Sequence, residues 1–483
     1  IRHKDWFEPV LYSPCAGEKF YSPCDYYGGD FAGIKQKLPY LAQIGVSVIY
    51  LNPIFEAASN HRYNTSDYLS VDPILGSDYD LTELSKAAAE YGIRLMADGV
   101  FSHTGDDSVY FNKYGTYPSC GAYSGADSPY YKWYEFKHFP DEYRCWWGFK
   151  TLPEVNELQP DYVRFTESVL KKWAGCGITS WRLELPDEFI KKLRTVLKKL
   201  DSDGVLLGEV WEDASNKVSG GGLRKFVLGD ELDSVMNYPF RDAVCDFLTC
   251  RTDAYALYET LSGQRERYPE PFYGACMNLL GSHDTQRILS CLSDAPPKDT
   301  LAREQQAEYQ YKPEAVVRGK RRLYAAFALM FSMPQPPCIY YGDEAGMMGL
   351  SDPFNRGSYP WGREDIEIRS FVMRLSALRR CNAALSSGKT AFAAPCADAF
   401  AVLRCRGEES ALTLVNRADH AVCAALGAED FREGPDALNV RTADKYSDAF
   451  ADGTVLQKDL GTGQIRVEIP PNGFLLLLSQ TAE

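Results

Sequence analysis

Four short apolar runs in this chain end in acidic, basic or imidazole side chains that can handle charge at a sugar ring. The runs are Ile93 to His103, Ile178 to Glu184, Val205 to Trp211 and Met277 to Asp284. Hydrolysis of a glycoside with retention needs a carboxylate nucleophile and a carboxylic acid about 5 to 5.5 Å apart. The ends of these runs supply carboxyl groups suited to such chemistry.

Glu209 is the better placed acid of the set. It follows the run Val205 to Gly208, so rigid backbone carries it, and the ring of Trp211 beside it can raise a carboxyl pKa by desolvation. A Glu at a strand end, taken alone, is more often a surface carboxylate. The presence of the other three runs makes a catalytic role the better interpretation of Glu209. We therefore take Glu209 as the candidate acid.

Arg182 can hold a carboxylate in its ionised state through bidentate hydrogen bonds, with Asp98 orienting the guanidinium. His283 and Asp284 end another run, where a neutral imidazole and a carboxylate would bind adjacent sugar hydroxyls. His103 ends the run that contains Asp98. Two of the six histidines thus fall at predicted strand ends, although a buried structural histidine is the ordinary alternative for each.

The elements that must position these residues are short buried strands, each followed by an amphipathic helical stretch. Because apolar strands that deliver polar residues at their carboxyl ends assemble the active site of a (β/α)8 barrel, we expect this α/β fold, a TIM barrel. The predicted strands are Val46–Leu51, Ile93–Ala97, Ile178–Leu183, Val205–Val210, Ser234–Asn237, Met277–Leu280 and Pro337–Tyr341.

Two further regions interrupt or follow this alternation. The gap before Ile178 is too long for one helix and is rich in Gly, Tyr, Ser and Asp, which predicts a small domain inserted after the third barrel strand. Beyond Arg380, short alternating runs predict a C-terminal antiparallel β-sandwich. The expected division is a barrel over residues 1–104 and 152–380, an inserted B domain over 105–151, and a sandwich over 381–483.

The composition limits the class of ligand. A net charge of −14 and a pI of about 5.1 disfavour nucleic acid and anionic membrane as partners, so a neutral ligand fits better. The 14 cysteines show no CxxC pair, and we read them as mostly reduced thiols of a cytoplasmic protein. Neither a signal sequence nor an apolar run of membrane-spanning length is recognisable.

In combination, the four runs resemble the four sequence regions of the α-amylase family of glycoside hydrolases (family 13). Additional runs are similar to its neopullulanase and cyclomaltodextrinase group. These additional runs are Leu51 to Tyr68, Leu152 to Asn156, Met236 to Arg241 and Ile339 to Glu344, and the match spans about residues 27 to 365. The resemblance implies the barrel, the B domain and the sandwich, and retaining chemistry on α-glucosidic bonds.

The resemblance also implies roles for particular residues. Glu209 would be the acid/base, Asp284 the stabiliser of the transition state and Arg182 the orienter of the nucleophile. The residues expected to bind the sugar, or to border its subsite, are His61, Tyr63, Asp98, His103, Trp211, His283, Asp352 and Arg356.

The sequence departs from the family at the nucleophile. The residue two after Arg182 is an Asp in the family and Glu184 here. Under a simple substitution the carboxylate sits one methylene further out, and a displacement on the order of 1 Å can cost about a hundredfold in rate. Under a second alignment, Glu184 to Ile190 is already the start of the next helix, and about four residues bearing the nucleophile are absent from this sequence.

Two hypotheses follow. The first is an enzyme that cleaves or transfers α-1,4 linkages, with α-1,6 linkages as a further candidate, in short maltooligosaccharides, pullulan or cyclomaltodextrins. The second is a catalytically degenerate relative that binds carbohydrate or a protein partner, motivated by Glu184. We expect no cofactor: the family often binds Ca²⁺, but Asp106 and Asp107 are more simply a solvated turn. A homodimer is compatible with the resemblance.

Overall fold

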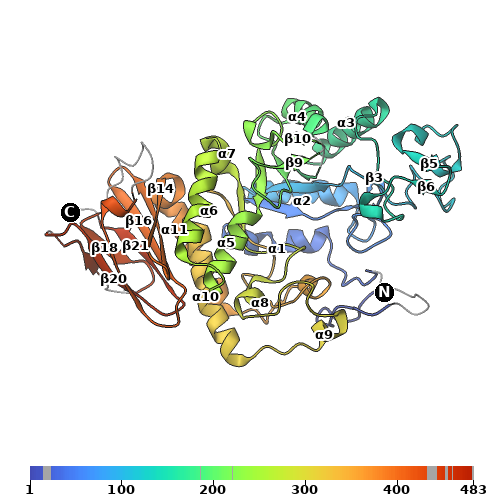
Figure 1. Cartoon of the computed structure of the whole chain (residues 1–483). Helices are drawn as coiled ribbons and strands as arrows, with labels where there is room; N and C mark the ends of the chain where they lie inside the picture. The colour runs from blue at the N-terminus through green and yellow to red at the C-terminus, as the bar shows by residue number, and fades with distance from the viewer. Residues whose placement is uncertain are drawn as a thin grey trace. The chain divides into compact units, whose positions relative to one another are not determined.

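The computed structural model describes residues 1–14, 23–184, 187–219, 221–431, 443–451, 455–459 and 461–480. The chain forms two compact units, the first made of residues 1–210 and 214–235, the second of 211–213 and 236–483. Figure 1 labels their helices and strands. The strand β11 contributes two residues to each unit.

The first unit alternates parallel strands with helices. Its elements are α1 (Phe31–Ile44), β1 (Val48–Leu51), β2 (Phe55–Ala57), β3 (Thr65–Val71), α2 (Asp78–Glu90), β4 (Arg94–Gly99), β5 (Phe136–His138), β6 (Glu142–Tyr143), α3 (Pro160–Gly175), β7 (Ile178–Leu183), α4 (Asp187–Leu200), β8 (Leu206–Gly208), β9 (Val218–Ser219), β10 (Gly222–Leu223) and β11 (Ser234–Asn237). These strands form a parallel sheet in the order β1, β4, β7, β8 and the first half of β11.

The central strands of this sheet are buried along nearly their whole length, as expected for parallel strands with both faces covered. Close packing fixes one glycine among them. A Cβ on Gly99 would lie 2.6 Å from Leu183 of the neighbouring strand and 2.8 Å from the ring of Phe101. Only glycine therefore lets β4 and β7 approach at the residue that follows Asp98.

The second unit contains the remaining parallel strands and the C-terminal sheets. Its elements are α5 (Tyr238–Leu248), α6 (Ala254–Arg267), α7 (Glu270–Ala275), β12 (Met277–Leu279), α8 (Ile288–Leu292), α9 (Arg303–Ala307), α10 (Pro313–Ser332), β13 (Pro337–Cys338), α11 (Ile366–Cys381), α12 (Ala383–Ser387), β14 (Lys389–Cys396), β15 (Ala399–Arg406), β16 (Glu409–Asn416), β17 (Val422–Leu426), β18 (Lys445–Asp448), β19 (Val455–Gln457), β20 (Ile465–Ile469) and β21 (Phe474–Ser479). The second half of β11 pairs in parallel with β12, and β12 with β13.

All seven strands predicted from apolar runs are present, in parallel pairs that follow chain order, which is the alternation of a (β/α)8 barrel. The C-terminal strands form an antiparallel sheet in the order β14-β15-β16-β21-β18-β19, beside the pair β17-β20. A single buried apolar cluster joins these two sheets. The helical region extends further than its pattern predicted, because α12 follows α11 after one residue.

Membrane-spanning helices and the state of the cysteines were the subject of two expectations from the sequence. In that part of the chain, no helix combines the length and the apolar character needed to cross a membrane. Twelve cysteines there are free thiols, while Cys24 is disulfide-bonded. Since disulfides are typical of oxidising compartments, the cytoplasmic assignment stays a prediction.

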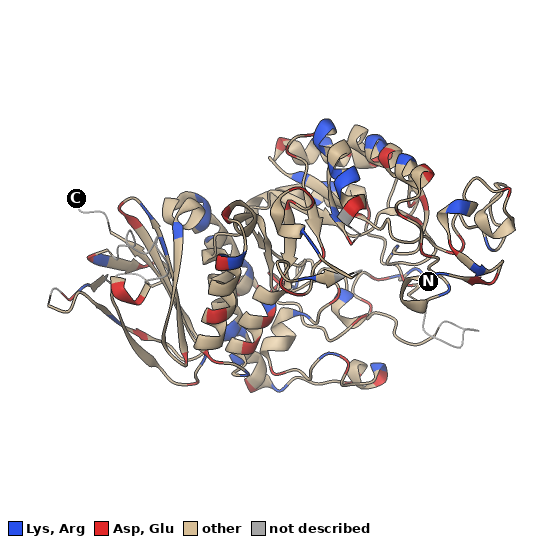
Figure 2. Cartoon of the chain, turned by 45° about the horizontal axis from the view of Figure 1, so that its top comes forward, with Lys and Arg blue, Asp and Glu red and all other residues tan. Residues whose placement is uncertain are grey.

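Three basic residues of helix α4 pair with acidic neighbours. Its Arg194 and Lys198 lie 2.6 and 3.1 Å from the carboxylate of Asp233, and Lys191 lies 3.3 Å from Glu231. Figure 2 shows acidic and basic residues on helices of both units. These three side chains of α4 are therefore paired with carboxylates of the first unit.

Candidate active site

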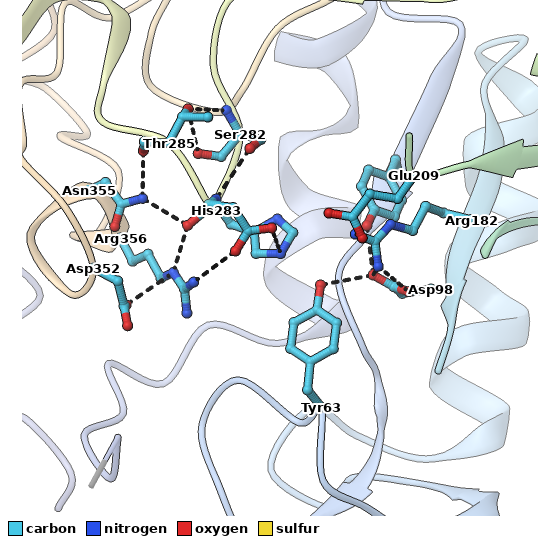
Figure 3. Close-up of polar contacts among 12 residues, drawn as sticks. Tyr63, Asp98, Arg182, Glu209, Ser282, His283, Thr285, Asp352, Asn355 and Arg356 are labelled. Carbon is cyan, nitrogen blue, oxygen red and sulfur yellow. Dashed lines mark hydrogen bonds and ion pairs between the residues drawn. The ribbon is translucent and has the colours of Figure 1, made fainter. Parts of the chain in front are cut away.

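A buried cluster at the carboxyl ends of β4, β7 and β8 centres on Arg182. Its Nη1 lies 3.2 Å from Oδ1 of Asp98, and its Nη2 forms an ion pair with Oε2 of Glu209 (Figure 3). Asp98 and Arg182 are register partners in the sheet, and the backbone N–H of Glu209 donates to the carbonyl of Leu183 at 3.0 Å. Adjacent strand ends thus bring together three residues that are far apart in sequence.

The carboxylate of Asp98 also accepts hydrogen bonds from two tyrosines. The hydroxyls of Tyr50 and Tyr63 lie 2.6 and 3.0 Å from its Oδ2. Burial, with the Asp98 charge as the next cause, raises the pKa of Tyr50 far above its ordinary value, so its hydroxyl remains a donor. Sequence reasoning included Tyr63 and missed Tyr50, although Tyr50 occupies the end of a predicted strand.

The two histidines expected in this unit are held by neighbouring groups. His103 is buried, its Nε2–H donates to the carbonyl of Tyr63 at 2.9 Å, and its Nδ1 lies 3.0 Å from Oγ of Ser102. Burial lowers the pKa of His103 to about 4, so the ring is neutral at neutral pH. Nδ1 of His61 accepts from the backbone N–H of Tyr63 at 3.0 Å, which leaves Nε2 as its protonated nitrogen.

Glu184 follows the last residue of β7, and its side chain is exposed. Alternation along a strand would direct residue 184 to the same face as Arg182. Leu185 and Pro186 lie outside the described residues, so the continuity of the backbone there is not tested. The helix α4 begins at Asp187, three residues after Glu184, where the second alignment places the start of the helix, and the choice between the two alignments stays a prediction.

The second unit carries its own polar cluster around His283 and Asp284, also drawn in Figure 3. Nε2 of His283 lies 3.0 Å from Oδ2 of Asp284, and Nη2 of Arg356 lies 3.5 Å from its Oδ1. Oδ1 of Asp352 is 3.2 Å from Nε of Arg356. The four residues predicted from the runs and the later loop are therefore grouped within this unit.

The backbone of this turn is held by side chains that sequence reasoning missed. Nδ2 of Asn355 donates to the carbonyls of His283 and Thr285 at 2.8 and 2.7 Å, and Nζ of Lys298 donates to that of Asp284 at 3.0 Å. All three carbonyls from 283 to 285 thus have side-chain donors from other loops.

Trp211, expected beside the acid, stacks on another ring of the second unit. Its ring centroid lies 3.7 Å from that of Tyr238, with the planes 9° apart, and 41% of the residue is exposed. An exposed aromatic face held by a buried ring is suited to stack on the C–H face of a sugar.

The two acids considered for Ca²⁺ have partners within the protein, and the expectation of a solvated turn is wrong for Asp106, which is buried. Oδ2 of Asp106 accepts from the hydroxyl of Tyr114 at 2.8 Å and lies 3.6 Å from Nζ of Lys113, so an ammonium already balances its charge. Oδ2 of Asp107 accepts from the hydroxyl of Ser66. Among the described residues, no group of three or more His, Cys, Asp or Glu side chains is arranged to hold a metal ion.

Comparison with known proteins decides the family. The family model for the catalytic domain of alpha amylase matches residues 11–187 and 183–386. The chain belongs to the alpha-amylase family. The two matches share residues 183–187, the stretch around Glu184.

Individual relatives agree with the family assignment. The chain is 34% identical to an amylopullulanase of Thermoanaerobacter thermohydrosulfuricus over 95% of its length, but it spans only about a third of that protein, 32%. It is 31% identical to a cyclomaltodextrinase of Geobacillus thermopakistaniensis, covering 94% of this chain and 71% of the relative.

Solved structures support the fold independently. Cyclic alpha-maltosyl-(1→6)-maltose hydrolase from Arthrobacter globiformis, in complex with its cyclic saccharide, superposes with a TM-score of 0.77 at 26% identity, over 99% of this chain and 94% of that one. The alpha-amylase family fold, a barrel with an inserted domain and a C-terminal sandwich, is thus shown for nearly the whole chain.

Proposed function

We propose that the protein is a retaining hydrolase or transglycosylase of α-glucans that acts on α-1,4 linkages, and also on α-1,6 linkages, of maltooligosaccharides, pullulan or cyclomaltodextrins. The observation that carries the proposal is the guanidinium of Arg182 between the carboxyl groups of Asp98 and Glu209. The names of the relatives support the substrate class, and they give no support to a catalytically degenerate protein.

The charges of this cluster suggest how Glu209 works. The carboxyl groups of Asp98 and Glu209 face the buried guanidinium of Arg182, so one added proton makes the three side chains neutral in sum. Asp98 accepts hydrogen bonds from Arg182, Tyr50 and Tyr63. When it is protonated, Glu209 donates that proton to the leaving oxygen, and it then takes a proton from water.

The remaining roles follow the family pattern and are part of the proposal. Asp284 stabilises positive charge that develops on the sugar ring. His61, Tyr63, His103 and His283 bind its hydroxyls, Trp211 forms an aromatic wall, and Asp352 with Arg356 borders the subsite. Glu184 is the candidate nucleophile under the substitution hypothesis. We also propose the domain division at residues 105, 152 and 381.

A first experiment tests turnover. The protein is incubated with maltotriose, pullulan and a cyclomaltodextrin, and the products are compared with those of Glu209→Gln. Loss of a general acid should lower kcat by a factor of about 10² to 10⁴. If neither protein gives turnover on any of the three substrates, the proposal fails.

A second experiment identifies the nucleophile. A fluorinated α-glucosyl fluoride that accumulates the glycosyl-enzyme is added, and peptides are analysed by mass spectrometry. The substitution hypothesis predicts the label on Glu184. A label on another carboxylate would favour the alignment in which the usual nucleophile segment is absent.

A further inference from the structure

The loop between α8 and α9 is joined by two hydrogen bonds to the turn that carries Asp284. Nζ of Lys298 donates to the carbonyl of Asp284 at 3.0 Å, and Nε2 of Gln286, two residues after Asp284, donates to the carbonyl of Pro296 at 2.9 Å. We call residues 294–299 the proline loop, because two prolines lie at its centre. The proline loop and the turn therefore hold each other through one side chain from each.

The backbone of the proline loop has little freedom. Asp294 and Asp299 have φ 57° and 65°, a left-handed conformation that is uncommon outside glycine, although Asp tolerates it better than most residues. Between them, the rings of Pro296 and Pro297 restrict φ. Because strained backbone persists only where the surrounding structure holds it, the contacts at the ends of this loop decide where it lies.

Two arginines of α10 hold Asp294. Its Oδ2 pairs with Arg318, and its Oδ1 lies 2.7 Å from Nη1 of Arg322. Burial acts to raise the pKa of Asp294, but hydrogen bonds from both arginines leave that pKa below its ordinary value, so the carboxylate stays charged. Nη1 of Arg322 also donates to the carbonyl of Leu292 at 3.1 Å. The start of the proline loop is therefore fixed to α10.

Arg322 also reaches the C-terminal sandwich. Its guanidinium is buried, and its Nε donates to Oδ1 of Asn472 at 3.1 Å. Asn472 is buried between β20 and β21, and its own N–H donates to the carbonyl of Ala418 at 2.7 Å. One guanidinium thus joins the sandwich to the proline loop, and Lys298 joins the proline loop to Asp284.

We propose that Lys298 is a positioning residue for Asp284 and that the sandwich fixes its place through the proline loop. A carboxylate that stabilises charge on the sugar must be placed closely, because a displacement of about 1 Å can cost about a hundredfold in rate. Arg322 is the link, since it bonds Asn472 on one side and Asp294 on the other. This inference rests on the proposed function, in which Asp284 is the stabiliser.

Kinetics on maltotriose test the role of Lys298. Lys298→Met keeps the length of the side chain and removes its donor, so kcat should fall about tenfold with KM within about twofold. Lys298→Arg should restore most of kcat, because it returns a cationic donor. Lys312→Met, which changes an exposed lysine directly before α10, is the matched control. No loss of kcat, a rise in KM of the same size, or no rescue by Lys298→Arg would overturn the inference.

A variant in the sandwich tests the link. Asn472 has φ 47°, where glycine is favoured, so Asn472→Gly removes the amide without straining the backbone. It should lower kcat about threefold in the parent and leave kcat unchanged in the Lys298→Met background. Arg417→Met is the control, since it breaks a different contact of the sandwich, with Thr252 and Asp398. Losses that multiply in the double variant, or an equal loss in Arg417→Met, would contradict the link.

Hydrogen exchange distinguishes this inference from the proposed function. Lys298→Met and Asn472→Gly should each speed exchange at the amides of Asp284 and Thr285 at least about threefold, measured by mass spectrometry, whereas Arg417→Met should not. If the parent turns over no glucan but these amides respond as expected, the proposed function fails and the link stands. Unchanged exchange in both variants would overturn the inference whether or not the protein is active.

Discussion

Arg182 and Glu209 form a buried ion pair although they end two different strands, β7 and β8. The pair works only with the planar fork of arginine, since the other arm of the same guanidinium holds Asp98. Orientation of both Glu209 and Asp98 therefore depends on one side chain.

Arg182→Lys should lower kcat by at least about a hundredfold, because a lysine cannot hold both carboxylates in one plane and small displacements are costly in rate. Steady-state kinetics on maltotriose measure the loss. Arg194→Lys is the control, since Arg194, on α4, pairs with Asp233 and not with Asp98 or Glu209. Equal activity of Arg182→Lys and the parent would contradict the assigned role.

Tyr50→Phe and Tyr63→Phe remove the same kind of hydrogen bond to Asp98 and should differ in kinetics. Tyr50 is not among the residues proposed to contact the sugar, so its variant should lower kcat with little change in KM. Tyr63 is proposed to contact the sugar, so its variant should raise KM as well. Each change should lower the free energy of unfolding by about 1.5 to 3 kcal/mol, the value for bonds to charged groups, measured by urea denaturation.

Asn355→Asp should misplace Asp284. The new carboxylate would face the carbonyls of His283 and Thr285, which now accept from the amide nitrogen of Asn355. We expect kcat on maltotriose to fall at least about tenfold with KM within threefold, since the acceptor oxygens lose their donor. Gln306→Glu is the matched control, because the Gln306 amide donates to the carbonyl of Leu301 instead. Similar losses in both variants would indicate general destabilisation.

His103 should make stability depend on pH. Burial lowers its pKa from the ordinary 6.5 to about 4 in the folded protein, so the unfolded chain binds more protons between these values. Stability should therefore fall as the pH drops from 6.5 to 4, by up to about 1.4 kcal/mol per pH unit. Urea denaturation across this range should give a flatter profile for His103→Asn. The same profile in parent and variant would refute this; His420→Asn, at an exposed site, is the control.

Arg404→Met should loosen the attachment of the sandwich to α10. The buried guanidinium of Arg404 donates to the carbonyls of Ser332 and Gly388 at 2.8 and 2.9 Å, and burial lowers its pKa to about 10. Loss of the donors leaves the buried carbonyl of Ser332 unpaired, at about 1 to 3 kcal/mol, and removes the partner of the half-buried carbonyl of Gly388. Thermal unfolding by calorimetry should show a lower Tm, with Arg406→Met, an exposed neighbour, unchanged.

The sequence was sufficient where the signal is local. Apolar runs of four to six residues placed all seven parallel strands, and the polar residues at their ends include Asp98, Arg182 and Glu209, which the structure joins. Register between parallel neighbours brings their carboxyl ends to one edge of the sheet. The C-terminal strands were predicted for the same reason, from alternation with period two.

Contacts that side chains make with distant segments could not be predicted from local patterns. Tyr50 was apolar enough to be counted as strand, and Asn355 carries no periodic signal at all, yet it lies 72 positions from the carbonyl of His283 that it holds. Spacing along the chain does not encode such contacts.

By itself, then, the order of residues determined the strand–helix alternation, the family pattern and the chemical types available at the strand ends, because hydrophobic periodicity is written along the chain. Tertiary structure alone decided which two carboxylates Arg182 holds and that His103 is buried and neutral. These depend on distances and desolvation between segments that only the folded chain brings together.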